Sequence, residues 1–153
     1  MRKGRANSIC GSSQVLGALE TPLHFHRRFL AFERAILTAV HQALPESSAD
    51  LMARQVMCVN KIQRLLDWQE VEFYCMRWFK VAWPGNVLAP NTGEIEVARA
   101  TLESSSGRMA VSVFWVLGHL FSIESKQSMR PFRNVSSPKV SEVQFLRDPM
   151  VAG

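Results

Sequence analysis

The chain has 153 residues, enough for one ordinary domain, and is 47% hydrophobic and 20% charged, a balance typical of globular rather than intrinsically disordered proteins. It has no run of about 18 apolar residues and no apolar stretch behind its basic start, so we expect neither a membrane span nor a secretory signal. The formal net charge is +5, but Arg2, Lys3 and Arg5 supply three of these charges before any acidic residue. The remaining 15 basic and 13 acidic residues nearly balance, which gives little support to a groove that follows phosphates.

The first 20 residues differ in composition from the rest of the chain. Residues 1–20 are rich in glycine, serine and asparagine and show no hydrophobic period, which predicts a flexible N-terminal arm. A single domain is expected over residues 21–150. A domain of this size buries roughly two thirds of its unfolded surface, so it needs no metal or disulfide to fold.

The cysteines indicate a reducing environment. Cys10, Cys58 and Cys75 are an odd, sparse set that does not match a disulfide framework. Cys58 and Cys75 have apolar neighbours in the sequence, so we predict that they are buried free thiols. Free thiols fit a cytoplasmic location.

The first predicted element of the domain is an amphipathic helix between Thr21-Pro22 and Leu44-Pro45. A threonine N-cap followed by proline is typical of a helix start, and the residue before a proline is pushed out of the helical conformation. Apolar residues recur at steps of three and four between these two signals: Phe25, Phe29, Phe32, Ile36, Val40 and Ala43.

A second predicted helix follows after a short link. Ser47 and Asp50 are three apart and resemble a capping box, with aspartate in place of the usual glutamate. One apolar face is formed by Met52, Val56, Val59, Ile62 and Leu66. A link this short predicts that the two helices are antiparallel neighbours.

The hydrophobic period changes from helical spacing to strand spacing near residue 70. The predicted strands cover residues 70–76, 94–102, 108–117, 120–125 and 140–146. The strand 108–117 is the most apolar, which predicts a central place in the sheet with much of both faces covered. Gly118-His119 is predicted to be the two-residue turn that follows it.

This element order predicts an α+β fold, with two N-terminal antiparallel helices packed on one face of a mostly antiparallel sheet of about five strands. The outline resembles the cone-shaped fold of the nuclear-transport-factor-2 and cystatin-like groups. That resemblance implies a pocket between helices and sheet. The expected lining residues are Trp115, Met109, Phe73, Phe29 and His119.

The chain contains no phosphate loop, dinucleotide fingerprint or nucleophile elbow. His24 and His26 are two apart and point to different sides of a helix, which makes a poor metal clamp. His119 is interpreted as a turn residue and ligand contact rather than a general base. We therefore expect no cofactor, no metal site and no catalytic residue, and an enzyme is the less favoured class.

A connection rich in aromatic residues is the first candidate site. Trp78, Phe79 and Trp83 are interleaved with Arg77 and Lys80. Aromatic and arginine side chains are enriched at interface hot spots, and nucleic-acid bases stack on aromatic rings beside basic groups. The competing interpretation is that these rings pack beneath a long connection and complete the core.

A basic loop is the second candidate site. Residues 126–139 contain Lys126, Arg130, Arg133 and Lys139 and no acidic residue. Loops of this length often bind a partner, here an acidic protein surface, a phosphate-bearing ligand or RNA. The competing interpretation is a solvated loop.

Three functional hypotheses follow from these features. The leading one is a non-enzymatic protein-interaction module that self-associates, because an apolar sheet face left over by two helices needs a further cover and a second subunit is the commonest one. The second is a small-molecule-binding or enzymatic pocket of the cone-shaped type. The third is RNA binding through Arg77, Lys80, Lys126, Arg130 and Arg133. No membrane partner is expected.

Overall fold

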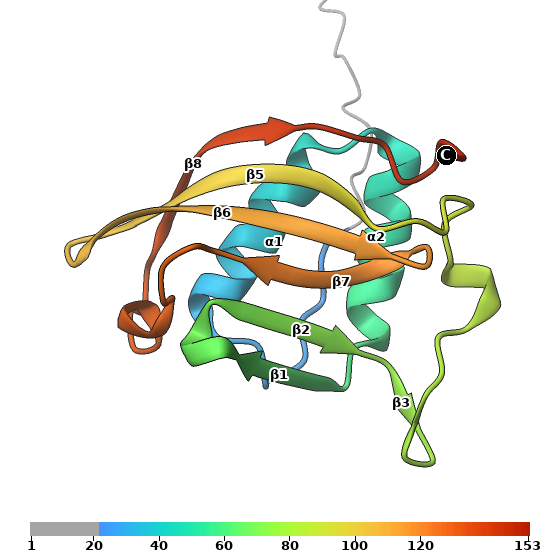
Figure 1. The fold of residues 1–153 in the computed structure, drawn as a ribbon, viewed down its shortest axis with the longest axis horizontal. Coiled ribbons are helices and arrows are strands. Elements are labelled where there is room, and N and C mark those ends of the chain that lie inside the picture. The colour runs from blue at the N-terminus through green and yellow to red at the C-terminus, as the bar shows by residue number, and fades with distance from the viewer. Residues whose placement is uncertain (1–21) are drawn as a thin grey trace, which may run out of the picture.

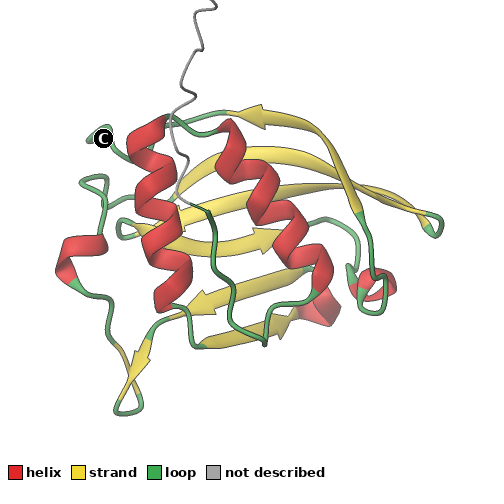
Figure 2. Ribbon diagram, turned by 180° about the vertical axis from the view of Figure 1, so that it is seen from behind, coloured by secondary structure: helices red, strands yellow, loops and turns green. Residues whose placement is uncertain are grey.

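The computed structural model describes residues 22–153, in which two helices cover one face of an antiparallel sheet (Figure 1). The helices are α1 (Ala31–Ala43) and α2 (Glu46–Cys58), and Figure 2 shows them side by side in front of the strands. The α+β class and the placement of both helices on one face are confirmed. No helix among residues 22–153 is long and apolar enough to cross a membrane. The predicted arm, residues 1–20, lies outside them.

The main sheet has six strands in the order β1-β2-β7-β6-β5-β8, and every neighbouring pair is antiparallel. A separate hairpin of two short strands, β3 and β4, follows β2 along the chain. The strand bounds are β1 (Lys61–Leu65), β2 (Glu70–Tyr74), β3 (Met76–Arg77), β4 (Lys80–Val81), β5 (Ile95–Ser104), β6 (Gly107–Val116), β7 (His119–Glu124) and β8 (Lys139–Phe145). Short 3-10 turns occur at Leu66–Trp68, Gly85–Val87 and Arg130–Phe132.

The first helix begins at Ala31, so the predicted start at Pro22 is wrong; Thr21 lies outside the described residues. The apolar residues before Ala31 enter the core from a non-helical lead-in. Phe29 stacks on Phe73 of β2 with ring centroids 5.5 Å apart, and Phe25 meets Phe29 edge to face at 5.1 Å. Because the lead-in buries its phenylalanines against the sheet, tertiary packing rather than local helical spacing determines its path.

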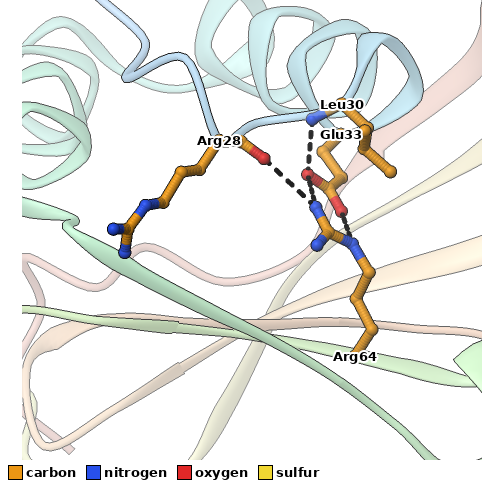
Figure 3. Close-up of polar contacts among 4 residues, drawn as sticks. All are labelled: Arg28, Leu30, Glu33 and Arg64. Atoms are coloured by element: carbon orange, nitrogen blue, oxygen red, sulfur yellow. Dashed lines mark hydrogen bonds and ion pairs between the residues drawn. The ribbon is translucent and has the colours of Figure 1, made fainter.

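A buried ion pair holds the start of α1 on the sheet (Figure 3). The Glu33 side chain is fully buried and accepts the backbone N–H of Leu30 at 2.8 Å. The Arg64 guanidinium of β1 donates to both Glu33 oxygens, at 2.8 and 2.9 Å. The same guanidinium donates to the Arg28 carbonyl at 3.2 Å. This two-pronged pair neutralises a carboxylate that burial would otherwise make costly.

The strand β1 occupies residues that the sequence assigned to the second helix. α2 ends at Cys58, so the predicted continuation to Leu66 is wrong, and the sheet has six strands rather than about five. The Asn60 side-chain amide donates to the Met76 carbonyl and accepts the Met76 N–H, both at 2.8 Å. These two bonds lie next to the first residue pair of β1 and β2, Lys61 and Tyr74. Arg64 and Ile62 both lie on the helix-facing side of β1. Because a charged residue occupies one of the inward positions, the sequence of β1 lacks the alternation of apolar and polar residues that predicts a strand.

The helix-facing layer is packed with large side chains. The largest fully buried ones include Trp115, Phe29, Phe32, Phe73 and Phe132. Four of the five residues expected to line a pocket lie in this core, and Phe29 and Phe73 stack directly on each other. The fifth, His119, alternates with buried Leu120 and therefore points to the opposite sheet face.

No α-helix of residues 22–153 lies on that opposite face, and Figure 1 looks directly onto it. We call it the open face. The expectation that β6 is covered on much of both faces is wrong, because Ala110 is exposed and Ser112 and Phe114 are half-exposed there. Met109, Val111, Val113 and Trp115 fill the helix-facing side of β6.

Candidate functional site

The β3–β4 hairpin presents two aromatic rings to solvent. Arg77 pairs with Lys80, so the two residues between the strands are Trp78 and Phe79. Their side chains are 84% and 98% exposed. Both have positive φ angles, 51° and 65°, as the central residues of a type I′ turn require. Bulky residues seldom adopt this conformation, which is usually taken by asparagine and glycine.

The hairpin is surrounded by basic side chains. Trp78 and Phe79 line a groove of about 620 Å³ together with Arg28 and Lys61. Arg77 and Lys80 flank the two rings in the chain and are exposed. We call these residues the hairpin surface: Arg28, Lys61, Arg77, Trp78, Phe79 and Lys80. Within residues 22–153 none of its four cations forms an ion pair, so it joins bare aromatic rings to uncompensated positive charge.

Trp83 and His119 form a separate structural pair. The two rings stack with centroids 4.4 Å apart and an interplanar angle of 17°. His119 is the first residue of β7 and donates from Nδ1 to the Leu120 carbonyl at 3.0 Å. Burial lowers the pKa of His119, so its ring is neutral near pH 7. The predicted turn at Gly118-His119 is wrong by one position, because Leu117 and Gly118 form it.

The residues of the basic loop lie at the other end of the sheet. Arg130 pairs with Asp67 at 3.2 Å, and the Arg133 guanidinium lies 5.9 Å from the Trp68 ring centroid. Figure 1 shows this segment between β7 and β8 at the left, whereas the hairpin projects at the lower right. The fold therefore does not join the basic loop and the aromatic connection into one surface.

A groove on the open face was not foreseen from the sequence. It has a volume of about 770 Å³. Its lining residues include apolar Leu66, Ala110 and Phe114, the carboxylates of Glu70, Glu96 and Glu124, and the cations Arg99 and Lys126. We call it the open-face groove. Lys126 is the one candidate of the basic loop that lines it.

Two carboxylates in this groove lie opposite each other on neighbouring strands. Glu70 of β2 lies directly opposite Glu124 of β7. Glu96 forms a two-pronged ion pair with Arg99 at 2.5 and 2.7 Å, whereas neither Glu70 nor Glu124 forms an ion pair within residues 22–153. Like charges directly opposite destabilise a strand pair. The groove is therefore acidic at its β2–β7 side.

The pKa shifts agree with this distribution of charge. Burial, followed by the carboxylates of Glu124 and Glu72, raises the pKa of Glu70. The hydrogen bond from Arg99 lowers the pKa of Glu96. Burial and the hydrogen bond that its hydroxyl donates to Glu72 raise the pKa of Tyr74 to about 12. Glu70 thus lies in negative potential that no ion pair of its own offsets within residues 22–153.

The sequence contained only part of this information. Its two carboxylate pairs, at 70 and 72 and at 94 and 96, alternate with apolar residues and indicate solvated strand faces. That expectation is wrong for Glu72, which is buried and accepts a hydrogen bond from the Tyr74 hydroxyl. The pairing of β2 with β7, two strands far apart in the chain, brings Glu124 opposite Glu70. No local sequence pattern predicts that Glu124 lies opposite Glu70.

Two neighbouring thiols lie at the end of α2 and between β2 and β3. Cys58 and Cys75 are free and half-buried, less enclosed than predicted, and Cys10 lies outside the described residues. Cys75 donates from Sγ to the Ala82 carbonyl at 3.2 Å, across the base of the hairpin. Burial, together with the neighbouring Cys58 thiol, raises the pKa of Cys75 and makes it a poor nucleophile. The described residues contain no group of three or more His, Cys, Asp or Glu side chains placed to hold a metal ion.

Comparison with known proteins assigns no family: no family model matches the chain, and neither a curated protein nor a solved structure is detectably similar to it.

Proposed function

We propose that this chain is a non-enzymatic protein-interaction module that self-associates, and that the β3–β4 hairpin is its contact element. The exposure of Trp78 and Phe79 at the tip of a left-handed turn carries this proposal. Residues held in such sparsely populated backbone conformations cost about 1–3 kcal/mol each and cluster where they serve binding or switching. An asparagine and a glycine would form the same turn without that cost.

The gain from covering the two rings is large compared with this strain. A tryptophan or phenylalanine buries about 150–250 Å². At about 25 cal/mol per Å², each ring contributes roughly 4–6 kcal/mol before the costs of association are deducted. Arg77 and Lys80 beside the rings add the long-range attraction that speeds encounter with an acidic surface.

A double substitution of the tip tests the proposal. Trp78→Asn with Phe79→Gly keeps the turn geometry and removes both rings. In sedimentation velocity over a concentration series, we expect the wild-type chain to pass from monomer to dimer and the variant to associate at least about tenfold more weakly, because 1.4 kcal/mol corresponds to a factor of ten. A wild-type chain that stays monomeric up to its solubility limit contradicts self-association.

The matched control is Leu117→Asn. Leu117 has a φ of 52° and is 63% exposed at the tip of the β6–β7 turn. It therefore presents an apolar side chain in the same backbone conformation but outside the hairpin surface. We expect this variant to associate like the wild type.

A second candidate function is binding of single-stranded RNA. It is favoured by the same pair of bare rings beside four cations, since bases stack on aromatic side chains in basic surroundings. An oligouridylate should then bind with an affinity that falls steeply with salt. Because the two basic regions lie at opposite ends of the sheet, Arg77→Ala should weaken binding and Arg133→Ala should not. Absence of binding at low salt excludes this candidate.

A further inference from the structure

The hairpin extends away from the open-face groove of its own chain. β2 begins at Glu70, which lines the groove, runs to Tyr74, and continues into β3. In Figure 1 the hairpin therefore projects beyond β1 and β2 at the end opposite to Glu70. Among residues 22–153, the hairpin of a chain therefore points away from the groove of that chain, and it can enter such a groove only on a second molecule.

The groove and the hairpin are complementary in apolar character. The groove offers Leu66, Ala110 and Phe114 as apolar contacts, and Leu66 is 69% exposed. Its volume of about 770 Å³ lies within the roughly 300–1,000 Å³ of pockets that enclose drug-sized groups, so two aromatic rings fit its size.

The two surfaces are also complementary in charge. Glu70 and Glu124 lie opposite each other on β2 and β7, and within residues 22–153 neither forms an ion pair that would offset their repulsion. Arg77 and Lys80 flank the aromatic tip, and neither forms an ion pair with a carboxylate of the described part of the chain, residues 22–153. Bringing these four groups together removes the repulsion and places the positive charges of the hairpin against an acidic surface.

We propose that the hairpin of one copy inserts Trp78 and Phe79 into the open-face groove of a second copy, with Arg77 and Lys80 beside Glu70 and Glu124. This inference rests on the proposed self-association and names the receptor for the hairpin. Each chain carries one hairpin and one groove, so a two-fold axis lets both insertions occur in one closed dimer. Association weakens as the NaCl concentration rises from about 0.1 M to about 1 M, because the Debye length shortens from about 10 Å to about 3 Å.

A charge exchange between two full-length variants tests the inference. The groove variant carries Glu70→Lys and Glu124→Lys, and the hairpin variant carries Arg77→Glu and Lys80→Glu. Each alone places like charges at both contacts of its own dimer and should associate at least about tenfold more weakly than the wild type by sedimentation velocity. An equimolar mixture pairs opposite charges at both contacts and should restore the dimer.

A two-charge control and a neutral variant separate the groove from general effects. Glu46→Lys with Glu142→Lys reverses two carboxylates outside the groove lining and should leave association unchanged. Glu70→Gln with Glu124→Gln removes the charges without adding cations, and circular dichroism checks that each variant is folded. The neutral variant should associate with a smaller salt dependence than the wild type.

The outcomes distinguish this inference from the proposed function. Restoration of the dimer only in the mixture supports insertion into the groove. If the Trp78→Asn, Phe79→Gly variant loses association while the folded groove and neutral variants keep it, the groove is not the receptor and the interaction module stands. If the wild-type chain never associates, both self-association and the groove as its site are wrong.

Discussion

The β3–β4 and β6–β7 hairpins both end in a two-residue turn at positive φ, but the surroundings of the two turns differ. In the β6–β7 turn, Leu117 and Gly118 have φ angles of 52° and 84°. The chain needs the glycine there, because a Cβ at position 118 would lie 2.4 Å from the Ala89 carbonyl oxygen. The Gly118 carbonyl accepts the Ala89 N–H at 2.7 Å and the Gln55 side chain at 2.9 Å. Tertiary contacts account for this turn.

The β3–β4 turn has no comparable support. Trp78 and Phe79 occupy the left-handed positions with their rings almost completely in solvent. The contacts of the residues in an unusual backbone conformation therefore indicate why the conformation is there. Where packing explains the conformation, it belongs to the fold; where large apolar side chains adopt it and touch little, it points to a partner.

The largest expected effect is at the supported turn. Gly118→Ala places a methyl group against the Ala89 backbone at a positive φ, so we expect the free energy of unfolding to fall by about 3 kcal/mol or more. Urea denaturation measures the change. Gly85→Ala is the matched control, since no atom lies within 4 Å of a Cβ there, and it should be nearly neutral. Equal effects for both glycines would contradict the packing explanation.

A smaller effect of opposite sign is expected at the exposed turn. Trp78→Asn with Phe79→Gly installs the residues that a type I′ turn favours and removes no buried contact. The free energy of unfolding should stay constant or rise by up to about 1 kcal/mol, because a projecting hairpin can fray separately from the core. A loss of more than about 1 kcal/mol in urea denaturation would mean that the rings stabilise the fold, and the contrast between the two turns would be lost.

The smallest effect concerns His119, which directly follows the supported turn. Its pKa is lower in the folded chain than the unfolded value near 6.5, because burial disfavours the charged ring. Its stabilising contribution is therefore complete above about pH 6.5 and decreases as the pH falls from there towards the folded pKa. Replacing His119 by phenylalanine should remove at most about 1.4 kcal/mol per pH unit from that dependence. Thermal unfolding between about pH 7.5 and about pH 5.5 measures it; an unchanged slope would mean that His119 stays exposed in the folded chain.

Strands were the part of the fold most readily predicted. The period of two located β2, β5, β6, β7 and β8 within a few residues, because one face of each strand is apolar and packs against the core. In β8 the apolar residues Val140 and Val143 are only partly buried. The helix signals were less reliable at their ends. Phe25 and Phe29 extend the helical stripe in sequence but pack from a non-helical segment, and Ile62 fitted a helix although it lies on β1.

The candidate site was predicted in part. Residues 77–80 were identified because two aromatic residues stand between two basic ones there. The sequence alone left open whether the rings were buried. Trp83 proved to be half-buried against His119, whereas Trp78 and Phe79 are exposed. The open-face groove was missed, because the residues that form it are separated along the chain by up to about 60 positions.

Local sequence patterns are enough to predict the α+β class and the unusual aromatic and basic connection, since both depend on the spacing and type of neighbouring residues. The folded arrangement is needed to see which rings are exposed, that Glu70 faces Glu124, and that the basic loop and the hairpin lie apart. These properties depend on strand order and register, which join residues distant in the chain, and no local period encodes them.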